Sequence, residues 1–235
     1  MRKIVVCLTG GVDSATLLIY LKKKGYKLCP VFFDYGQRAV FQERKAFEFF
    51  VNFLGIQQKA IIKVPYANKI THAHISGIDV PEFREEDLLN HQKHIQIAQI
   101  DFVPYRNLIF AVLGVIYAEA VSAKEVAFGF NADSTLDTCP DATQEFLDKL
   151  QQVINLSVLD REAVKITAPL IHYTKSQIVN LGFELNVPYE KTYSCFRGKD
   201  IHCGRCEGCV KRKLAFSEAG VEDPTVYETN GYEKA

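Results

Sequence analysis

The segment from Thr9 to Ser14 constrains the fold of this chain more than any other part of the sequence. It reads Thr-Gly-Gly-Val-Asp-Ser, and it joins the apolar run Ile4 to Leu8 to a helical pattern. Glycines let backbone N–H groups approach an anion closely because they carry no Cβ, and the start of the next helix adds unpaired donors and a positive dipole end. This order predicts a nucleotide site, with a plain strand-to-helix turn as the alternative. The predicted contact residues are Leu8, Thr9, Gly10, Gly11, Val12, Asp13 and Ser14.

Apolar and amphipathic segments alternate along most of the chain. The pattern predicts strands at 3–8, 28–33, 60–64, 126–130 and 164–167, and helices at 14–24, 41–54, 107–122, 143–157 and 175–181. Near-continuous apolar strands separated by amphipathic helices indicate a parallel sheet that is covered on both faces. We therefore expect a Rossmann-like or flavodoxin-like α/β domain over residues 1–190.

Residues 65–104 interrupt this alternation. A connection of that length is usually functional or partly disordered, and we interpret it as a lid or an interface arm. It contains His72, His74, His91 and His94, which we expect to be solvated loop residues and not metal ligands. Residues 218–235 are predicted to form a weakly ordered tail.

The composition argues against several classes of protein. Lys plus Arg and Asp plus Glu each number 28, so the formal charge is zero, which argues against an obligate nucleic-acid partner. The longest apolar stretch, 108–121, contains Glu119 and is too short to span a membrane. The seven cysteines, without a recognisable secretory signal, indicate a reducing compartment. We expect a cytoplasmic protein with no membrane partner.

Four of the cysteines form a C-x7-C-G-R-C-E-G-C cluster: Cys195, Cys203, Cys206 and Cys209. Four thiolates are the ligand set of a closed, structural Zn²⁺ site. An iron–sulfur cluster is the alternative, since it also takes four cysteines. We expect residues 191–217 to be a zinc-binding segment packed on the main domain, and His202 to lie beside the metal without binding it.

Three smaller features point to the same site as the glycine loop. Arg106 and Asn107 begin a predicted helix and suit an anion, although a simple capping role also explains the asparagine. Lys175 begins another predicted helix and is a candidate phosphate contact, with a surface lysine as the alternative. Asp133 and Asp141 follow the strand predicted at 126–130, and ligands bind at the carboxyl ends of strands in such sheets.

The features that occur together and in order are Thr9–Ser14, Asp34-Tyr35-Gly36-Gln37-Arg38, the F-V-P-Y-R-N run at 102–107, Pro169-Leu170, Lys175 and the four cysteines. This set, over roughly residues 3–214, resembles the 7-cyano-7-deazaguanine synthase (QueC) family of the PP-loop ATP pyrophosphatase superfamily. The resemblance implies an ATP-dependent ligase that contains a structural zinc ion. It implies a homodimer as well, since members of the family are often dimers. It also implies that the enzyme adenylates 7-carboxy-7-deazaguanine, releases pyrophosphate, and uses ammonia to form an amide and then the nitrile on the path to queuosine.

The same resemblance implies roles for individual residues. ATP would contact Asp34, Tyr35, Gln37, Arg106 and Asn107 in addition to the glycine loop. Asp13 would orient the loop or bind Mg²⁺, Ser14 would donate to phosphate, and Arg106 and Lys175 would balance charge on the β- and γ-phosphates. No side-chain nucleophile is needed, because adenylation itself activates the carboxylate.

This chain departs from the family pattern at residues expected to contact the substrate that ATP activates, and in the cysteine spacing. Tyr105 replaces the glycine of F-V-P-G-R-N, residues 136–143 keep Pro-Asp but lose a Cys and an Arg, and the first cysteine spacing is one residue shorter. Tyr105, Asp133 and Asp141 are the predicted substrate contacts. A divergent paralogue that conjugates the activated group to an amine of a partner protein is one alternative. A tRNA-modifying PP-loop enzyme and a non-catalytic nucleotide or zinc-binding module are others.

Overall fold

Five parallel strands form one sheet: β1 (Lys3–Cys7), β2 (Lys27–Asp34), β3 (Ala60–Lys63), β4 (Glu125–Ala127) and β5 (Lys165–Thr167). The computed structural model describes residues 2–64, 74–75, 78–159 and 162–228. The strands pair in the order β3-β2-β1-β4-β5, with Val5 opposite Cys29 on one side and opposite Val126 on the other. The chain thus winds outward from β1 in one direction and from β4 in the other. The space beyond the carboxyl ends of these two strands is where such sheets bind ligands.

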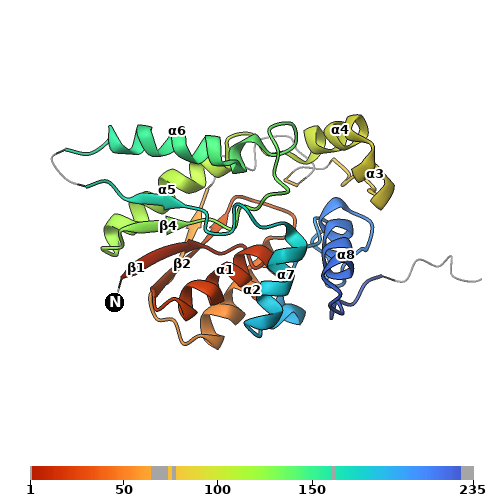
Figure 1. Ribbon diagram of the computed structural model, residues 1–235, viewed down its shortest axis with the longest axis horizontal. Coiled ribbons are helices and arrows are strands. Elements are labelled where there is room, and N and C mark those ends of the chain that lie inside the picture. The colour runs from red at the N-terminus through yellow and green to blue at the C-terminus, as the bar shows by residue number, and fades with distance from the viewer. Residues whose placement is uncertain (1, 65–73, 76–77, 160–161, 229–235) are drawn as a thin grey trace, which may run out of the picture.

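Helices cover both faces of this sheet, which confirms the predicted fold class (Figure 1). One face carries α1 (Val12–Lys23), α2 (Val40–Phe53) and α7 (Lys175–Glu184), and the other carries α5 (Arg106–Ala120) and α6 (Gln144–Asn155). Successive side chains of a strand point to opposite faces. Ile4 and Val6 therefore lie in the core under α1 and α2, while Val5 and Cys7 lie in the core under α5 and α6. Burial on both faces explains why the strands are almost continuously apolar.

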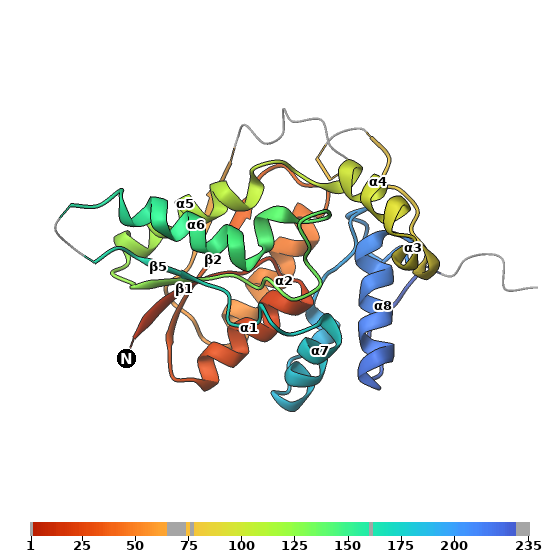
Figure 2. The same cartoon turned by 45° about the horizontal axis from the view of Figure 1, so that its top comes forward.

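Three helices were not expected from the sequence: α3 (Glu85–Leu89), α4 (His91–Asp101) and α8 (Glu207–Ala219). The face that α8 buries includes Glu207, Cys209 and Arg212, so the helix does not show a regular apolar pattern in the sequence. Within the predicted arm, α3 and α4 lie beside α8 (Figure 2). Phe83, Ile97 and Val210 form a small core between them. Residues 78–104 are therefore packed against the cysteine segment, and the arm's first residues, 65–73 and 76–77, lie outside the described part.

The histidines of this region are not all solvated loop residues. His94 lies on α4 with a side chain only 13% exposed and contacts Glu207 at 3.2 Å. His91 begins the same helix and lies 3.4 Å from Asp137. The ring of His74 lies 4.2 Å from that of Phe196, whereas His72 is outside the described residues. The loop expectation was wrong for His91 and His94, because α4 forms where α8 can cover it.

The tail is ordered further than expected. Gly220 ends α8 in the left-handed conformation, and the chain then folds back so that both carboxylate oxygens of Asp223 share the Nε–H of the fully buried Arg212. Tyr227 also donates to Asp223. These contacts correct the prediction of weak order for residues 219–228, while 229–235 lie outside the described residues.

Within the described ranges, no single helix has both the length and the apolar composition needed to cross a membrane. Only α4 and α5 taken together, across a bend of 53°, meet that test, and they do so by length and composition alone.

Candidate functional site

The glycine loop lies at the carboxyl end of β1, beside β4, where the winding direction changes. Gly10 has a φ of +82°, and a Cβ there would lie 2.7 Å from the Cβ of Ala46 on α2, so both conformation and space require glycine. Ser14 holds the loop closed: its hydroxyl lies 3.0 Å from the Thr9 hydroxyl and donates to the Gly11 carbonyl at 3.2 Å. The loop is thus preorganised, with the first N–H groups of α1 at its mouth.

Two predicted catalytic residues from distant parts of the chain meet in front of this loop. Lys175 Nζ lies 2.5 Å from Asp13 Oδ2, and both side chains are 20% exposed. The second carboxylate oxygen of Asp13 is buried with no hydrogen-bond partner in the described structure. Asp133 accepts a hydrogen bond from the backbone N–H of Lys175 at 3.0 Å and so ties the loop after β4 to the start of α7.

The F-V-P-Y-R-N run turns into α5 beside the same space. Tyr105 has a φ of +64°, the left-handed region that favours glycine, and its side chain is 70% exposed, so the structure does not bring it to the site. Arg106 does reach the site, with its guanidinium 6.0 Å from the centre of the Tyr35 ring. The Asn107 amide donates to Asp141 Oδ1 at 2.9 Å, and its backbone N–H donates to Oδ2 at 3.2 Å. Asn107 and Asp141 are therefore hydrogen-bonded to each other, and this pair joins α5 to the loop after β4.

In the turn after β2, the predicted ATP contacts Asp34 and Gln37 also form hydrogen bonds within the protein. The Gln37 side chain accepts from the Tyr35 N–H at 3.0 Å and donates to Glu43 at 2.8 Å, while Asp34 accepts from the Gly36 N–H at 3.3 Å. Burial raises the pKa of the Glu43 carboxyl, and the hydrogen bond from Gln37 opposes that effect. Glu43 lies against the glycine loop, although no sequence motif marks it.

Two adjoining cavities meet at the glycine loop and share Thr9, Gly11, Asp13 and Arg106 in their walls. The first, which we name the apolar cavity, has a volume of about 340 Å³. Its walls include Leu8, Val31, Phe33, Phe110, Phe128 and Phe130. An apolar, aromatic wall beside a phosphate-binding loop suits the base of a nucleotide.

The second, which we name the polar cavity, has a volume of about 320 Å³ and extends from the loop toward α4 and α8. Its charged lining consists of Asp13, Glu43, Asp101, Arg106, Asp133, Lys175, Glu207 and Lys211. Asp101, Glu207 and Lys211 were missed from the sequence, because they reach the cavity only through the packing of α4 on α8. Cys139 also lines it, and burial raises the pKa of its thiol to about 11, so the thiol is not a ready nucleophile.

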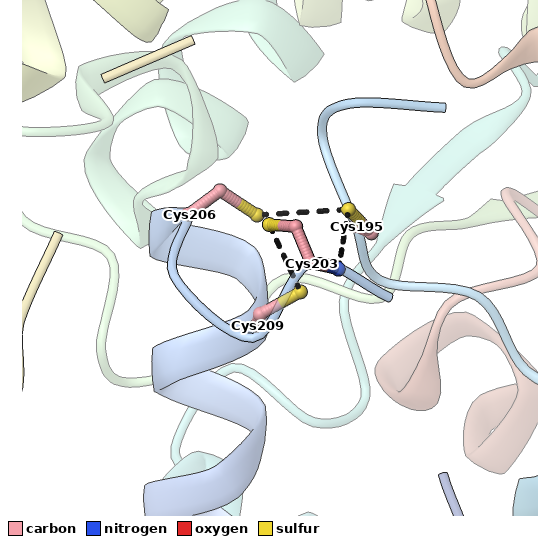
Figure 3. A group of neighbouring side chains, drawn as sticks. All are labelled: Cys195, Cys203, Cys206 and Cys209. Carbon is pink, nitrogen blue, oxygen red and sulfur yellow. Dashed lines mark hydrogen bonds between the residues drawn. The ribbon is translucent and has the colours of Figure 1, made fainter. Parts of the chain in front are cut away.

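The four cysteines converge at the start of α8 (Figure 3). All four are buried, and their sulfur atoms lie within 4.8 Å of one another, with Cys203 and Cys209 at 3.9 Å and Cys195 and Cys206 at 4.0 Å. A tetrahedron of sulfurs about 2.3 Å from a zinc ion has edges of about 3.8 Å. The donor set and its spacing therefore fit a structural zinc ion with no open position.

The surroundings of the cysteines support the same assignment. Backbone N–H groups of Phe196 and Cys203 donate to sulfur atoms at 3.4 Å, which offsets negative charge on bound thiolates. A Cβ on Gly208 would lie 2.2 Å from the Ser194 carbonyl, so only glycine lets α8 approach this closely. The His202 ring nitrogen accepts from the Ser194 N–H at 3.0 Å, and its ring lies beside the segment that holds the four cysteines.

The chain is similar to known proteins along nearly its whole length. The family model described as "Queuosine biosynthesis protein QueC" matches residues 3–220. The chain is 35% identical to the 7-cyano-7-deazaguanine synthase of Methanothermobacter thermautotrophicus over 97% of its own length and 99% of that protein, and 36% identical to the one of Methanococcus aeolicus over 96% and 99%.

The U34-tRNA thiolase NcsA of Methanococcus maripaludis, solved with its [4Fe-4S] cluster, superposes with a TM-score of 0.50 at 17% identity. It aligns over 93% of this chain and 67% of that one, and the likeness shows a shared fold alone. The sequence relatives and the family model together establish the membership that the motifs implied: the chain belongs to the QueC family of queuosine biosynthesis proteins.

Proposed function

We propose that this protein is an ATP-dependent, AMP-forming ligase that converts the carboxylate of 7-carboxy-7-deazaguanine into the nitrile of 7-cyano-7-deazaguanine. The observation that carries the proposal is the glycine loop between two cavities, in a chain whose relatives are named 7-cyano-7-deazaguanine synthase along nearly their full length. The apolar cavity would take the adenine and the polar cavity the second substrate. The phosphates would lie between them, at the loop and the start of α1.

In the first step, a carboxylate oxygen of the substrate attacks the α-phosphorus of ATP, and the bond to the β-phosphate breaks. Pyrophosphate leaves with the electron pair of that bond. Lys175 and Arg106 face this region and would balance the charge of the leaving group. When the nucleotide binds, the Lys175 ammonium would leave the Asp13 carboxylate and contact a phosphate instead.

In the second step, ammonia attacks the acyl carbon, AMP leaves, and the nitrogen loses a proton to give the amide. The amide oxygen then attacks the α-phosphorus of a second ATP, pyrophosphate leaves, and the nitrogen loses a proton. Loss of AMP, carrying that oxygen, together with a proton gives the nitrile. None of these steps needs a side-chain nucleophile, in keeping with the raised pKa of Cys139.

Two metal ions accompany this proposal. The unpartnered oxygen of Asp13 is a suitable ligand for Mg²⁺ near the phosphates, where the ion would neutralise charge on the leaving pyrophosphate. The four cysteines would hold zinc as a structural ion that fixes α8 against Ser194 and Phe196. The homodimer, the protein amine as alternative acceptor and the cytoplasmic location stay predictions.

The proposal is tested with ATP, Mg²⁺ and 7-carboxy-7-deazaguanine. Without ammonium we expect release of pyrophosphate and formation of an acyl adenylate. Once ammonium is added, we expect AMP and the masses of the amide and then the nitrile. Asp148→Asn, an exposed change on α6, is the matched control for surface effects. AMP formation without either product would contradict the synthase assignment. A gain in mass on an added protein would instead establish the conjugating activity.

A further inference from the structure

Asp101, the last residue of α4, carries a carboxylate whose oxygens have no use in the fold. The residue is 5% exposed, and neither oxygen has a hydrogen-bond partner in the described structure. The residue is part of the wall of the polar cavity. An unpaired buried carboxylate destabilises a protein, so its position calls for a ligand that supplies donors.

The charged neighbours of Asp101 are already paired with each other. Glu207 lies 2.5 Å from Lys211 Nζ and 3.2 Å from the ring nitrogen of His94. Burial, and after it the charge of Glu207, raise the pKa of Asp101 to about 7, while Lys211 opposes that rise. Asp101 is thus the carboxylate on the α4–α8 wall of the cavity whose two oxygens are buried and have no partner in the described structure.

The two carboxylate oxygens of Asp101 indicate which hydrogen-bond donors a ligand would need. A carboxylate accepts two parallel hydrogen bonds best from a pair of adjacent N–H donors. A fused 2-amino-4-oxopyrimidine presents such a pair, the ring N–H and the exocyclic amino group, along one edge. Phe102 and Phe196 also line the cavity and offer apolar surface to a flat ring.

We propose that Asp101 is the specificity-determining residue for the substrate base, and that it accepts hydrogen bonds from the ring N–H and the 2-amino group of a fused 2-amino-4-oxopyrimidine. The proposal rests on the proposed function, since it places the base against α4 and directs its carboxylate toward the glycine loop in the same cavity. Asp101 takes no part in bond making. Its role is to reject rings that lack the donor pair.

The test compares 7-carboxy-7-deazaguanine with its analogue that lacks the 2-amino group. Binding is measured by calorimetry on the zinc-loaded protein for wild type, Asp101→Ala, Asp101→Asn and the control Asp148→Asn. We expect wild type and control to bind the analogue roughly 10- to 100-fold more weakly, the loss for one hydrogen bond to a charged group. Asp101→Ala should bind the two ligands within about threefold of each other. Asp101→Asn should favour the analogue, because its amide presents a donor to the 2-amino group.

Three outcomes would overturn the proposal. Full discrimination in Asp101→Ala, with zinc content and melting temperature showing a folded protein, would mean that another group reads the base. An unchanged discrimination with a raised KM for ammonium would make Asp101 part of an ammonium site. If the wild type binds neither ligand and releases no pyrophosphate, the proposed function fails and this inference falls with it. If pyrophosphate is released but the variants still discriminate between the two ligands as the wild type does, this inference alone is refuted.

Discussion

Replacing Asp101 by asparagine should make the ligand-free protein more stable, although the change adds no contact. The wild-type carboxyl is buried and unpaired, and burial followed by the charge of Glu207 raises its pKa from 3.8 to about 7. A carboxyl with a raised pKa binds its proton more tightly in the folded state than in the unfolded state. Stability is therefore lost as the pH rises through this range, and the loss is complete above pH 7.

The size of the effect follows from those two pKa values. Between them each pH unit removes about 1.4 kcal/mol of stability, so the full loss is of order 4 kcal/mol, and about half of it is present at pH 5.5. Relaxation around a buried charge reduces this loss, and the new amide is itself unpaired. We expect a net gain of about 2 kcal/mol at pH 8 and about 1 kcal/mol at pH 5.5.

Urea denaturation of the zinc-loaded proteins at these two pH values measures the gain as a difference in unfolding free energy. Asp148→Asn makes the same chemical change at an exposed position and should alter stability by less than about 0.5 kcal/mol at either pH. A variant at Asp101 that is no more stable than wild type at pH 8 would refute the reasoning. A gain of equal size at both pH values would show that the raised pKa is not its cause.

Three further perturbations have distinct expected results. Lys175→Met removes the cation that contacts Asp13 and should lower kcat/KM for ATP by roughly 100-fold without changing the zinc content; an unchanged value would remove Lys175 from the phosphate site. Cys206→Ala should reduce bound zinc, measured by mass spectrometry of the metal, from one ion per chain to near zero, whereas retained zinc would argue against the four-sulfur site. Arg212→Ala removes the buried cation that pairs with Asp223, and urea denaturation should show a loss of about 3–5 kcal/mol, unlike the small effect of an exposed pair.

The parts of the fold that were predicted correctly are those that depend on residues close together in the sequence. The sheet, the glycine loop and the helices on both faces follow from apolar runs and turn residues that lie close together in the sequence. The four-cysteine cluster was also predicted in full, because its ligand spacing is local. The helices α3, α4 and α8 were missed because they bury polar groups, such as Arg212, that only their neighbours can satisfy.

The candidate site was predictable in its motifs but not in its pairings. Asp13 was expected to orient the glycine loop or bind Mg²⁺, and Lys175 to contact phosphate, but their contact joins residues 162 positions apart. Tyr105 was expected at the substrate because of its place in a motif, but the left-handed backbone there directs its side chain to solvent. Asp101 had no sequence signal at all. A buried, unpaired carboxylate is recognisable only when the packing of α4 against α8 is known.

The proposed function depends on an acyl adenylate, in which a carboxylate oxygen of the substrate is bonded to the α-phosphorus of ATP. The direct measurement uses 7-carboxy-7-deazaguanine labelled with ¹⁸O in its carboxylate, together with ATP, Mg²⁺ and ammonium, followed by mass spectrometry of the AMP. The proposed mechanism transfers one carboxylate oxygen to AMP in each of the two rounds, so the AMP should carry one ¹⁸O while pyrophosphate carries none. Unlabelled AMP, or the label in pyrophosphate or inorganic phosphate, would contradict attack at the α-phosphorus and with it the proposed function.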